Sequence, residues 1–175
     1  MMAEGGGGGG EEKTLVEILE ESIPIDLNKY VNYVRSPSAG AIATFEGTTR
    51  DTFEGRKVVE LRYEAYVGMA ERKLRSICGE ARGRWEVEAV AAAHRVGTVG
   101  VGEASVFVAV AAVHRAEAME ACRFVIDEIK ASVPIWKKEV YEDGEVWKEN
   151  KEFFEGGGGG CCGKKERVEA HVSGG

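Results

Sequence analysis

Two basic clusters flank one predicted helix, and both are suited to binding anions. His114 and Arg115 precede the helix, and Lys130 lies near its end. Pro134 ends the helix, and the sequence Ile-Trp-Lys-Lys-Glu follows at residues 135–139. A lysine amine beside other cations can hold an anion, and it can attack an acyl group when those cations lower its pKa. The pattern therefore indicates a site for anionic or acyl substrates.

The first cluster has two interpretations. A helix start carries free backbone N–H groups that favour an anion, and His114 and Arg115 lead directly into it. The alternative is a surface ion pair between Arg115 and Glu117 or Glu120. The spacing alone is compatible with both.

The motif Ala-Ala-Xaa-His-Arg occurs twice, ending at His94-Arg95 and at His114-Arg115. If the two strands that carry these copies form an antiparallel hairpin, His94 lies beside its turn and His114 at its far end. Ten strand residues span roughly 33 Å, so the two copies cannot serve one pocket within one chain. We expect His94 and Arg95 to be structural and to cap a strand end.

The second cluster is also open to a structural interpretation, because a cation such as Lys130 is favoured in the last turn of any helix. In the strand that follows, alternation predicts that Lys137 points to one side with Ile135, and Lys138 to the other. If Lys137 faces Lys130 across the turn, each lowers the pKa of the other. Arg50, in a polar loop, is either a third cation of the site or a solvated arginine.

Arg115 and Lys130 are fifteen residues apart on the same predicted helix, which corresponds to roughly 22 Å along its axis. We therefore expect that they do not contact the same small ligand within one subunit. Either the protein has two sites, or a symmetric dimer brings His114 and Arg115 of one subunit to Lys130 of the other.

The composition of the chain excludes several classes of protein. The 175 residues carry a net charge of −7, which argues against a general nucleic-acid-binding surface and requires any anion site to be local. No apolar run reaches about 18 residues, so we expect no membrane span. The acidic, Gly-rich residues 1–12 resemble neither a signal sequence nor a transit peptide. We expect a cytoplasmic (cytosolic) protein.

The four cysteines give little sign of metal or redox chemistry. Cys78 and Cys122 fall in helical patterns, where buried free thiols are common. Cys161 and Cys162 are adjacent and lack the two-residue spacing of zinc or redox pairs. We expect a functionally silent tail there and no metal site; zinc-linked regulation is the weaker alternative.

Glycine tracts divide the chain into three parts. Residues 1–12 and 156–175 are predicted to be disordered Gly-rich tails, and residues 13–155 to form one domain. Apolar periodicity within this domain predicts helices and strands. The helices are expected at 14–21, 69–85 and 116–132, and the strands at 40–46, 58–66, 87–93, 104–113, 135–141 and 145–148.

The order of these elements predicts an α+β fold: an antiparallel sheet with helices packed on one face, plus a small extra β-subdomain. We expect strands 40–46 and 58–66 to form a hairpin with a long mobile loop. Asp143-Gly144 predicts a second, tight hairpin near the end of the domain.

With these segments in order, the chain resembles the large, catalytic subunit of molybdopterin synthase over about 110 residues. The most specific segment is PIWKKE at 134–139, preceded by Lys130. The other matching segments are GAIATFEGTTR (40–50), LRYEAYVGM (61–69), His94-Arg95-Val96-Gly97, Gly102-Glu103, His114-Arg115, Gly144 and Trp147.

The resemblance implies a sulfurtransferase of molybdenum cofactor biosynthesis that converts cyclic pyranopterin monophosphate to molybdopterin. The sulfur would come from the thiocarboxylated C-terminus of a ubiquitin-like small subunit. A homodimer of large subunits would form the centre of a heterotetramer, without nucleic acid, membrane, metal or other cofactor.

The resemblance also implies roles for the basic residues. Lys130 and Lys137 would be catalytic and would contact substrate, and the further substrate-binding residues would be Arg50, His114, Arg115, Lys138 and Glu139. Lys130 would act either by stabilising charge or as a general acid or base. The alternative function is a non-catalytic dimeric module that docks a ubiquitin-like partner or an anionic metabolite.

Overall fold

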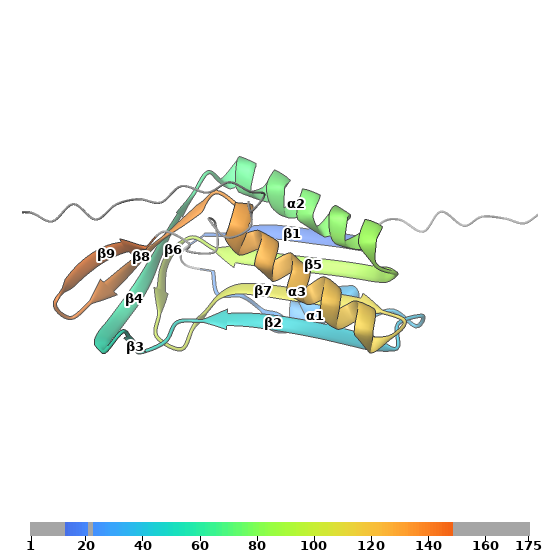
Figure 1. Cartoon of the computed structure of the whole chain (residues 1–175), viewed down its shortest axis with the longest axis horizontal. Coiled ribbons are helices and arrows are strands. Elements are labelled where there is room, and N and C mark those ends of the chain that lie inside the picture. Colours follow the sequence, from blue (N-terminus) through green and yellow to red (C-terminus); the bar gives the residue numbers. More distant parts are fainter. Residues whose placement is uncertain (1–12, 21–22, 149–175) are drawn as a thin grey trace, which may run out of the picture.

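The computed structural model describes residues 13–20 and 23–148, and it has the predicted α+β fold (Figure 1). Two sheets meet near the middle of the molecule. We call them the helix-covered sheet and the outer sheet; the latter is the predicted β-subdomain. The predicted tails, the end of the domain at residue 155 and the Cys161-Cys162 pair lie outside the described residues. No helix of the described part is long and apolar enough to cross a membrane.

The helix-covered sheet has four strands. Its central strands, β5 and β7, are antiparallel and buried almost throughout, and they consist largely of Ala and Val. Such runs are typical of strands covered on both faces. The strand order is β1 (Lys13–Leu19), β5 (Val87–Arg95), β7 (Ala104–Ala112) and β2 (Ala41–Thr48), with β1 parallel to β5 and β2 antiparallel to β7.

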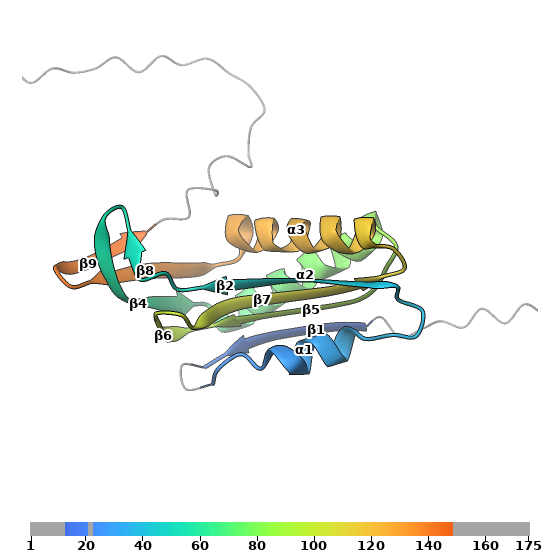
Figure 2. The same ribbon diagram turned by 90° about the horizontal axis from the view of Figure 1, so that it is seen from below.

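Helices cover both faces of this sheet (Figure 2). The predicted helices α2 (Val67–Arg84) and α3 (Arg115–Ser132) pack together on one face. A third helix, α1 (Leu27–Val34), packs on the other through Tyr30 and Val34, and sequence analysis did not predict it. The larger core therefore lies beneath α2 and α3, as expected, and α1 adds a second core.

The outer sheet contains β3 (Thr52–Phe53), β4 (Arg56–Ala65), β6 (Gly97–Gly100), β8 (Ile135–Tyr141) and β9 (Gly144–Lys148). Strand β4 pairs with β8 and β6, and β8 pairs with β9 through the predicted hairpin. Gly144 has φ 140°, a backbone conformation that favours glycine. Pro134 separates α3 from β8, so the end of α3 lies where the two sheets meet.

Two predictions about local structure were wrong. Residues 14–21 were predicted as a helix, but Lys13–Leu19 is strand β1, because pairing with β5 satisfies its backbone and places Leu15 and Val16 in different cores. The predicted hairpin of 40–46 with 58–66 does not form, although both strands exist. β2 pairs with β7, and β4 turns back on β3 through Glu54 and Gly55, both at positive φ.

Candidate active site

A pocket of about 710 Å³ lies at the junction of the two sheets. Its walls come from the last turns of α3, from β4 and β8, and from the ends of β2 and β5. Arg50, Lys130 and Lys137 all line it, so the structure brings Arg50 together with two lysines that come much later in the sequence. Apolar side chains such as Phe45 and Ile129 form much of the remaining wall. Apolar walls lower the local dielectric, so the cations act more strongly on a bound anion.

Lys130 is positioned by the last turn of α3. Its amine lies 6.0 Å from the ring centroid of Phe45, close enough for a cation–π contact. Ile126 and Ile129, on the preceding turn, are buried in the core and fix this end of the helix. The side chain of Lys130 is thereby directed over the end of β2.

Strand β2 changes direction as it reaches the pocket. Its register against β7 shifts between Gly47 and Thr48, and such a bulge bends a strand. A Cβ atom on Gly47 would lie 2.5 Å from Cγ1 of Val106, so the close approach of β2 to β7 requires glycine here. Arg50 follows directly, and its guanidinium lies 5.0 Å from the ring centroid of Phe53. The predicted third cation therefore lies at the pocket.

Strand β8 sends its two lysines to different surroundings, as the alternation predicted. Lys137 lines the pocket, and its amine lies 3.1 Å from Oε1 of Glu139. Lys138 instead forms an ion pair with Glu145 and lies 5.2 Å from the ring centroid of Trp147. Of the two, only Lys137 is a pocket residue.

Glu139 is almost completely buried in the pocket wall. Its carboxylate accepts a hydrogen bond from the hydroxyl of Tyr141 and pairs with Lys137. This partner for Lys137 was not expected from the spacing, which suggested only the neighbouring charge of Lys130.

His114 and Arg115 lie at the opposite end of α3, are exposed, and do not line the pocket. α3 has 18 residues, which confirms that one subunit keeps Arg115 and Lys130 apart. Within residues 13–20 and 23–148, Arg115 forms no ion pair with Glu117, and Glu120 accepts a hydrogen bond from Trp85 instead. The surface ion pair considered for Arg115 is therefore not formed.

His94 lines the pocket, although sequence analysis assigned it only a structural role. Its Nδ1 lies 2.7 Å from the carbonyl oxygen of Arg95, which can only accept, so Nδ1 carries the proton. The ring packs edge-on against Tyr63. Burial lowers the pKa of His94 to about 4, so the imidazole is neutral near pH 7. In the sequence, the available sign of this location was the place of His94 at the end of a buried strand, before a Gly-rich turn.

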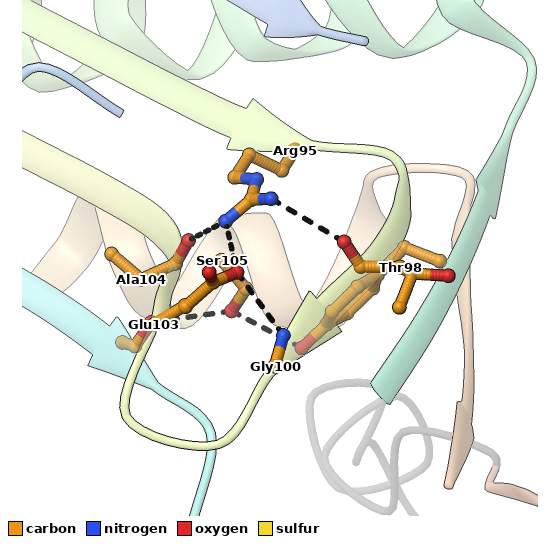
Figure 3. A network of polar contacts seen from close by, with 8 residues as sticks. Arg95, Thr98, Gly100, Glu103, Ala104 and Ser105 are labelled. Carbon is orange, nitrogen blue, oxygen red and sulfur yellow. Dashed lines mark hydrogen bonds and ion pairs between the residues drawn. The ribbon is translucent and has the colours of Figure 1, made fainter. Parts of the chain in front are cut away.

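Arg95 is structural, as predicted (Figure 3). Its guanidinium pairs with Glu103 at 2.9 Å and donates to the carbonyl oxygens of Thr98 and Ala104. Glu103 also accepts from the N–H of Gly100, and these two donors, Arg95 first, hold its pKa below the usual value. The network fixes the turn that carries β6 to the outer sheet.

A short chain of hydrogen bonds joins the two sheets in the pocket wall. The hydroxyl of Tyr63, on β4, donates to Ser105, on β7, and Ser105 donates to the carbonyl oxygen of Gly47, on β2. Burial, the largest cause, raises the pKa of Tyr63, so the phenol stays protonated and can donate. The bonds hold β4, and with it β8, against the end of β2.

No group of three or more His, Cys, Asp or Glu side chains in the described part of the chain could hold a metal ion. Cys78 and Cys122 are buried free thiols, as predicted. Burial raises the pKa of Cys78 to about 12 and that of Cys122 to about 11, so neither is a ready nucleophile. Neither thiol lines the pocket, whose cationic side chains are Arg50, Lys130 and Lys137.

Comparison with known proteins gives a consistent result. The profile of the MoaE protein family matches residues 20–132. The chain is 62% identical to the molybdopterin synthase catalytic subunit of Oryza sativa subsp. japonica, over 90% of this chain and 92% of that protein. It is 48% identical to the human protein of the same name, over 81% of this chain and 74% of that protein.

Solved structures agree. Molybdopterin synthase from Staphylococcus aureus has a TM-score of 0.72 and 38% sequence identity, covering 75% of this chain and 95% of that one. Identity at this level over most of both chains exceeds what a shared fold alone would give. The chain belongs to the MoaE protein family.

Proposed function

We propose that this chain is the catalytic subunit of a molybdopterin synthase, a sulfurtransferase of molybdenum cofactor biosynthesis. Its substrate is cyclic pyranopterin monophosphate, and its product is the dithiolene molybdopterin. The sulfur donor is the thiocarboxylated C-terminus of a ubiquitin-like small subunit. The proteins it matches carry the name of that catalytic subunit. We also propose that it works in the cytosol.

The observation that carries this proposal is the cationic pocket. The chain has a net charge of −7, yet Arg50, Lys130 and Lys137 line one cavity. A cyclic phosphate and a thiocarboxylate are both anions, and they repel each other unless positive charge lies between them. A pocket with several cations on rigid elements lets the two anions approach.

The three cations take different roles in this proposal. Lys130, on the end of α3, lies closest to the reacting atoms and stabilises the negative charge that develops as sulfur attacks the pterin side chain. Lys137, held by Glu139, is a second catalytic cation beside it. Arg50, on the exposed rim, binds the phosphate, because a guanidinium offers several donors to phosphate oxygens.

The first cluster, His114 and Arg115, joins this site through a dimer. Strand β2 lies at the edge of the helix-covered sheet, so a second copy can pair with it. Antiparallel pairing of two β2 strands about a two-fold axis brings the start of one strand beside the end of the other. Ala41, at the start, pairs with Ala112, only two residues before His114, whereas Gly47 and Thr48, at the end, line the pocket.

Such a dimer places His114 and Arg115 of each subunit toward the pocket of the other. The composite site adds a helix N-terminus and a guanidinium to the three cations, and both suit a phosphate. Two large subunits at the centre leave each pocket available to one small subunit, which gives a heterotetramer.

The test is reconstitution. The purified chain is mixed with thiocarboxylated small subunit and cyclic pyranopterin monophosphate, and the products are followed by mass spectrometry. The proposal predicts a dithiolene product and loss of sulfur from the small subunit. Stable binding of the small subunit without product would instead support the non-catalytic docking module and would overturn the proposal.

A further inference from the structure

One face of β8 carries an unbroken polar chain that extends beyond the pocket lysine. Lys137, Glu139 and Tyr141 alternate along the strand, so their side chains lie on the same face. The ammonium of Lys137 lies 3.1 Å from Oε1 of Glu139, and the hydroxyl of Tyr141 donates to Oε2. The carboxylate of Glu139 thus has one of these donors on each side of it along the strand, Lys137 at Oε1 and Tyr141 at Oε2.

The ring of Tyr141 is itself held in place by Arg56. The guanidinium carbon of Arg56, on β4, lies 3.8 Å from the centroid of the Tyr141 ring. Arg56 is fixed in turn by Asp143 in the β8–β9 turn, at 2.7 Å. Only 4% of the surface of Tyr141 is exposed. The phenol therefore has little freedom to leave Glu139.

This arrangement matters because it fixes how the carboxylate of Glu139 is turned. A carboxylate can rotate, and a buried one turns toward whichever donors are present. The hydroxyl of Tyr141 donates to Oε2, and Lys137 pairs with Oε1. Without the hydroxyl, the buried Oε2 loses this donor, and Lys137 no longer has a single orientation imposed on it.

We propose that Tyr141 is a positioning residue, which acts through Glu139 to hold the ammonium of Lys137 toward the pocket. The inference rests on the proposed function, because it assigns Tyr141 to the site in which Lys137 acts. Tyr141 is not among the residues that line the pocket. Its effect therefore reaches the reaction only through the carboxylate.

The molecule contains a matched control for this idea. On the opposite face of the helix-covered sheet, Lys29, Glu17 and Tyr30 form a cluster of the same three residue types. The amine of Lys29 lies 2.6 Å from Glu17, and the hydroxyl of Tyr30 donates to the same carboxylate at 2.6 Å. None of the three lines the pocket. A purely structural Lys–Glu–Tyr cluster should behave like this one.

The experiment compares Tyr141→Phe with Tyr30→Phe in the full chain bound to its small subunit. Both changes remove one hydroxyl and keep the ring, so Arg56 still has a ring to pack on. We expect Tyr141→Phe to lower kcat roughly tenfold with little change in the KM for the small subunit, because a hydrogen bond to a charged group is lost. Tyr30→Phe should leave kcat unchanged.

A double-mutant cycle tests whether the effect passes through the carboxylate. If Tyr141 acts through Glu139, then Tyr141→Phe has no further effect on kcat in a Glu139→Gln background. Multiplicative losses in the double variant, or wild-type kcat in Tyr141→Phe, would overturn the inference.

A readout independent of activity separates this inference from the proposed function. The lysine amines are dimethylated with ¹³C, which keeps their charge, and the Lys137 signal is assigned by its absence in Lys137→Arg. Tyr141→Phe should shift and broaden this signal, whereas Tyr30→Phe should not move it. An unchanged signal in Tyr141→Phe contradicts the positioning role, whether or not the protein transfers sulfur.

Discussion

The two ends of α3 carry similar cationic side chains in different surroundings. At the C-terminal end, β8 and β4 close over Lys130 and complete a pocket with two further cations. At the N-terminal end, which lies away from the outer sheet (Figure 1), His114 and Arg115 are exposed and line no part of that pocket. The difference shows that the basic residues of α3 form a pocket where the outer sheet covers the end of the helix. We propose that another subunit supplies that layer at the exposed end.

The largest expected effect separates the enclosed end from the exposed one. Lys130→Ala should lower kcat roughly 1,000-fold, because it removes the pocket cation nearest to the developing charge. Arg115→Ala should lower kcat roughly 100-fold, because a contributed guanidinium binds phosphate more than it stabilises the reacting atoms. Single-turnover sulfur transfer measures both. A larger loss for Arg115→Ala would mean that the exposed end contributes more to kcat than the enclosed end.

A second comparison uses the neighbouring lysines of β8. Lys137→Ala should lower kcat roughly 30-fold, because Lys137 faces the pocket. Lys138→Ala should change kcat less than about threefold, because its ion pair with Glu145 is partly exposed and lies away from the pocket. The same sulfur-transfer assay measures both effects. A Lys138 effect equal to that of Lys137 would mean that the substrate reaches both faces of β8.

Most of the helices and strands could be predicted from the sequence, because the residue patterns that indicate them are local and clear. The apolar stripe of α3, the alternation in β8 and the Asp143-Gly144 turn each depend on neighbours in the chain. The misassigned β1 and the absent β2–β4 hairpin depend instead on partners far away, β5 for the first and β7 for the second. A single sequence contains no direct signal for such pairings.

The site could be predicted only in part, because some of its contacts also join segments that are distant in the chain. The resemblance named Lys130, Lys137 and Arg50, and the structure places all three in one pocket. Spacing could not show that Glu139 pairs with Lys137 or that His94 lines the wall, because both depend on how β4, β5 and β8 meet. The resemblance also named Lys138, whose side chain pairs with Glu145 and does not line the pocket, so its contact with substrate stays a prediction.

The smallest expected effect concerns pH and stability at the enclosed end. The pKa of His94 is lowered to about 4 in the folded protein and rises to about 6.5 on unfolding, so the unfolded chain binds the extra proton first. Stability is therefore lost as the pH falls below about 6.5. His94 alone should destabilise the fold by about 2 kcal/mol between pH 8 and pH 5.

Urea unfolding at the two pH values measures this loss. In His94→Gln the difference between pH 8 and pH 5 should shrink by about that amount, because glutamine does not titrate. The comparison depends on the pH dependence rather than on absolute stability, so a destabilised variant is still informative. An unchanged pH dependence in His94→Gln would show that His94 is not held neutral in the pocket wall.

The central claim is that both ends of α3 serve one site, each from a different subunit, and mixing inactive chains tests it most directly. Lys130→Ala and Arg115→Ala chains are co-expressed, so that dimers form at random. Each mixed dimer then has one pocket with both changes and one with neither. We predict recovery of sulfur transfer to about a quarter of the wild-type rate, since half of the dimers have one intact site of two. A mixture no more active than its two parents would contradict the shared site.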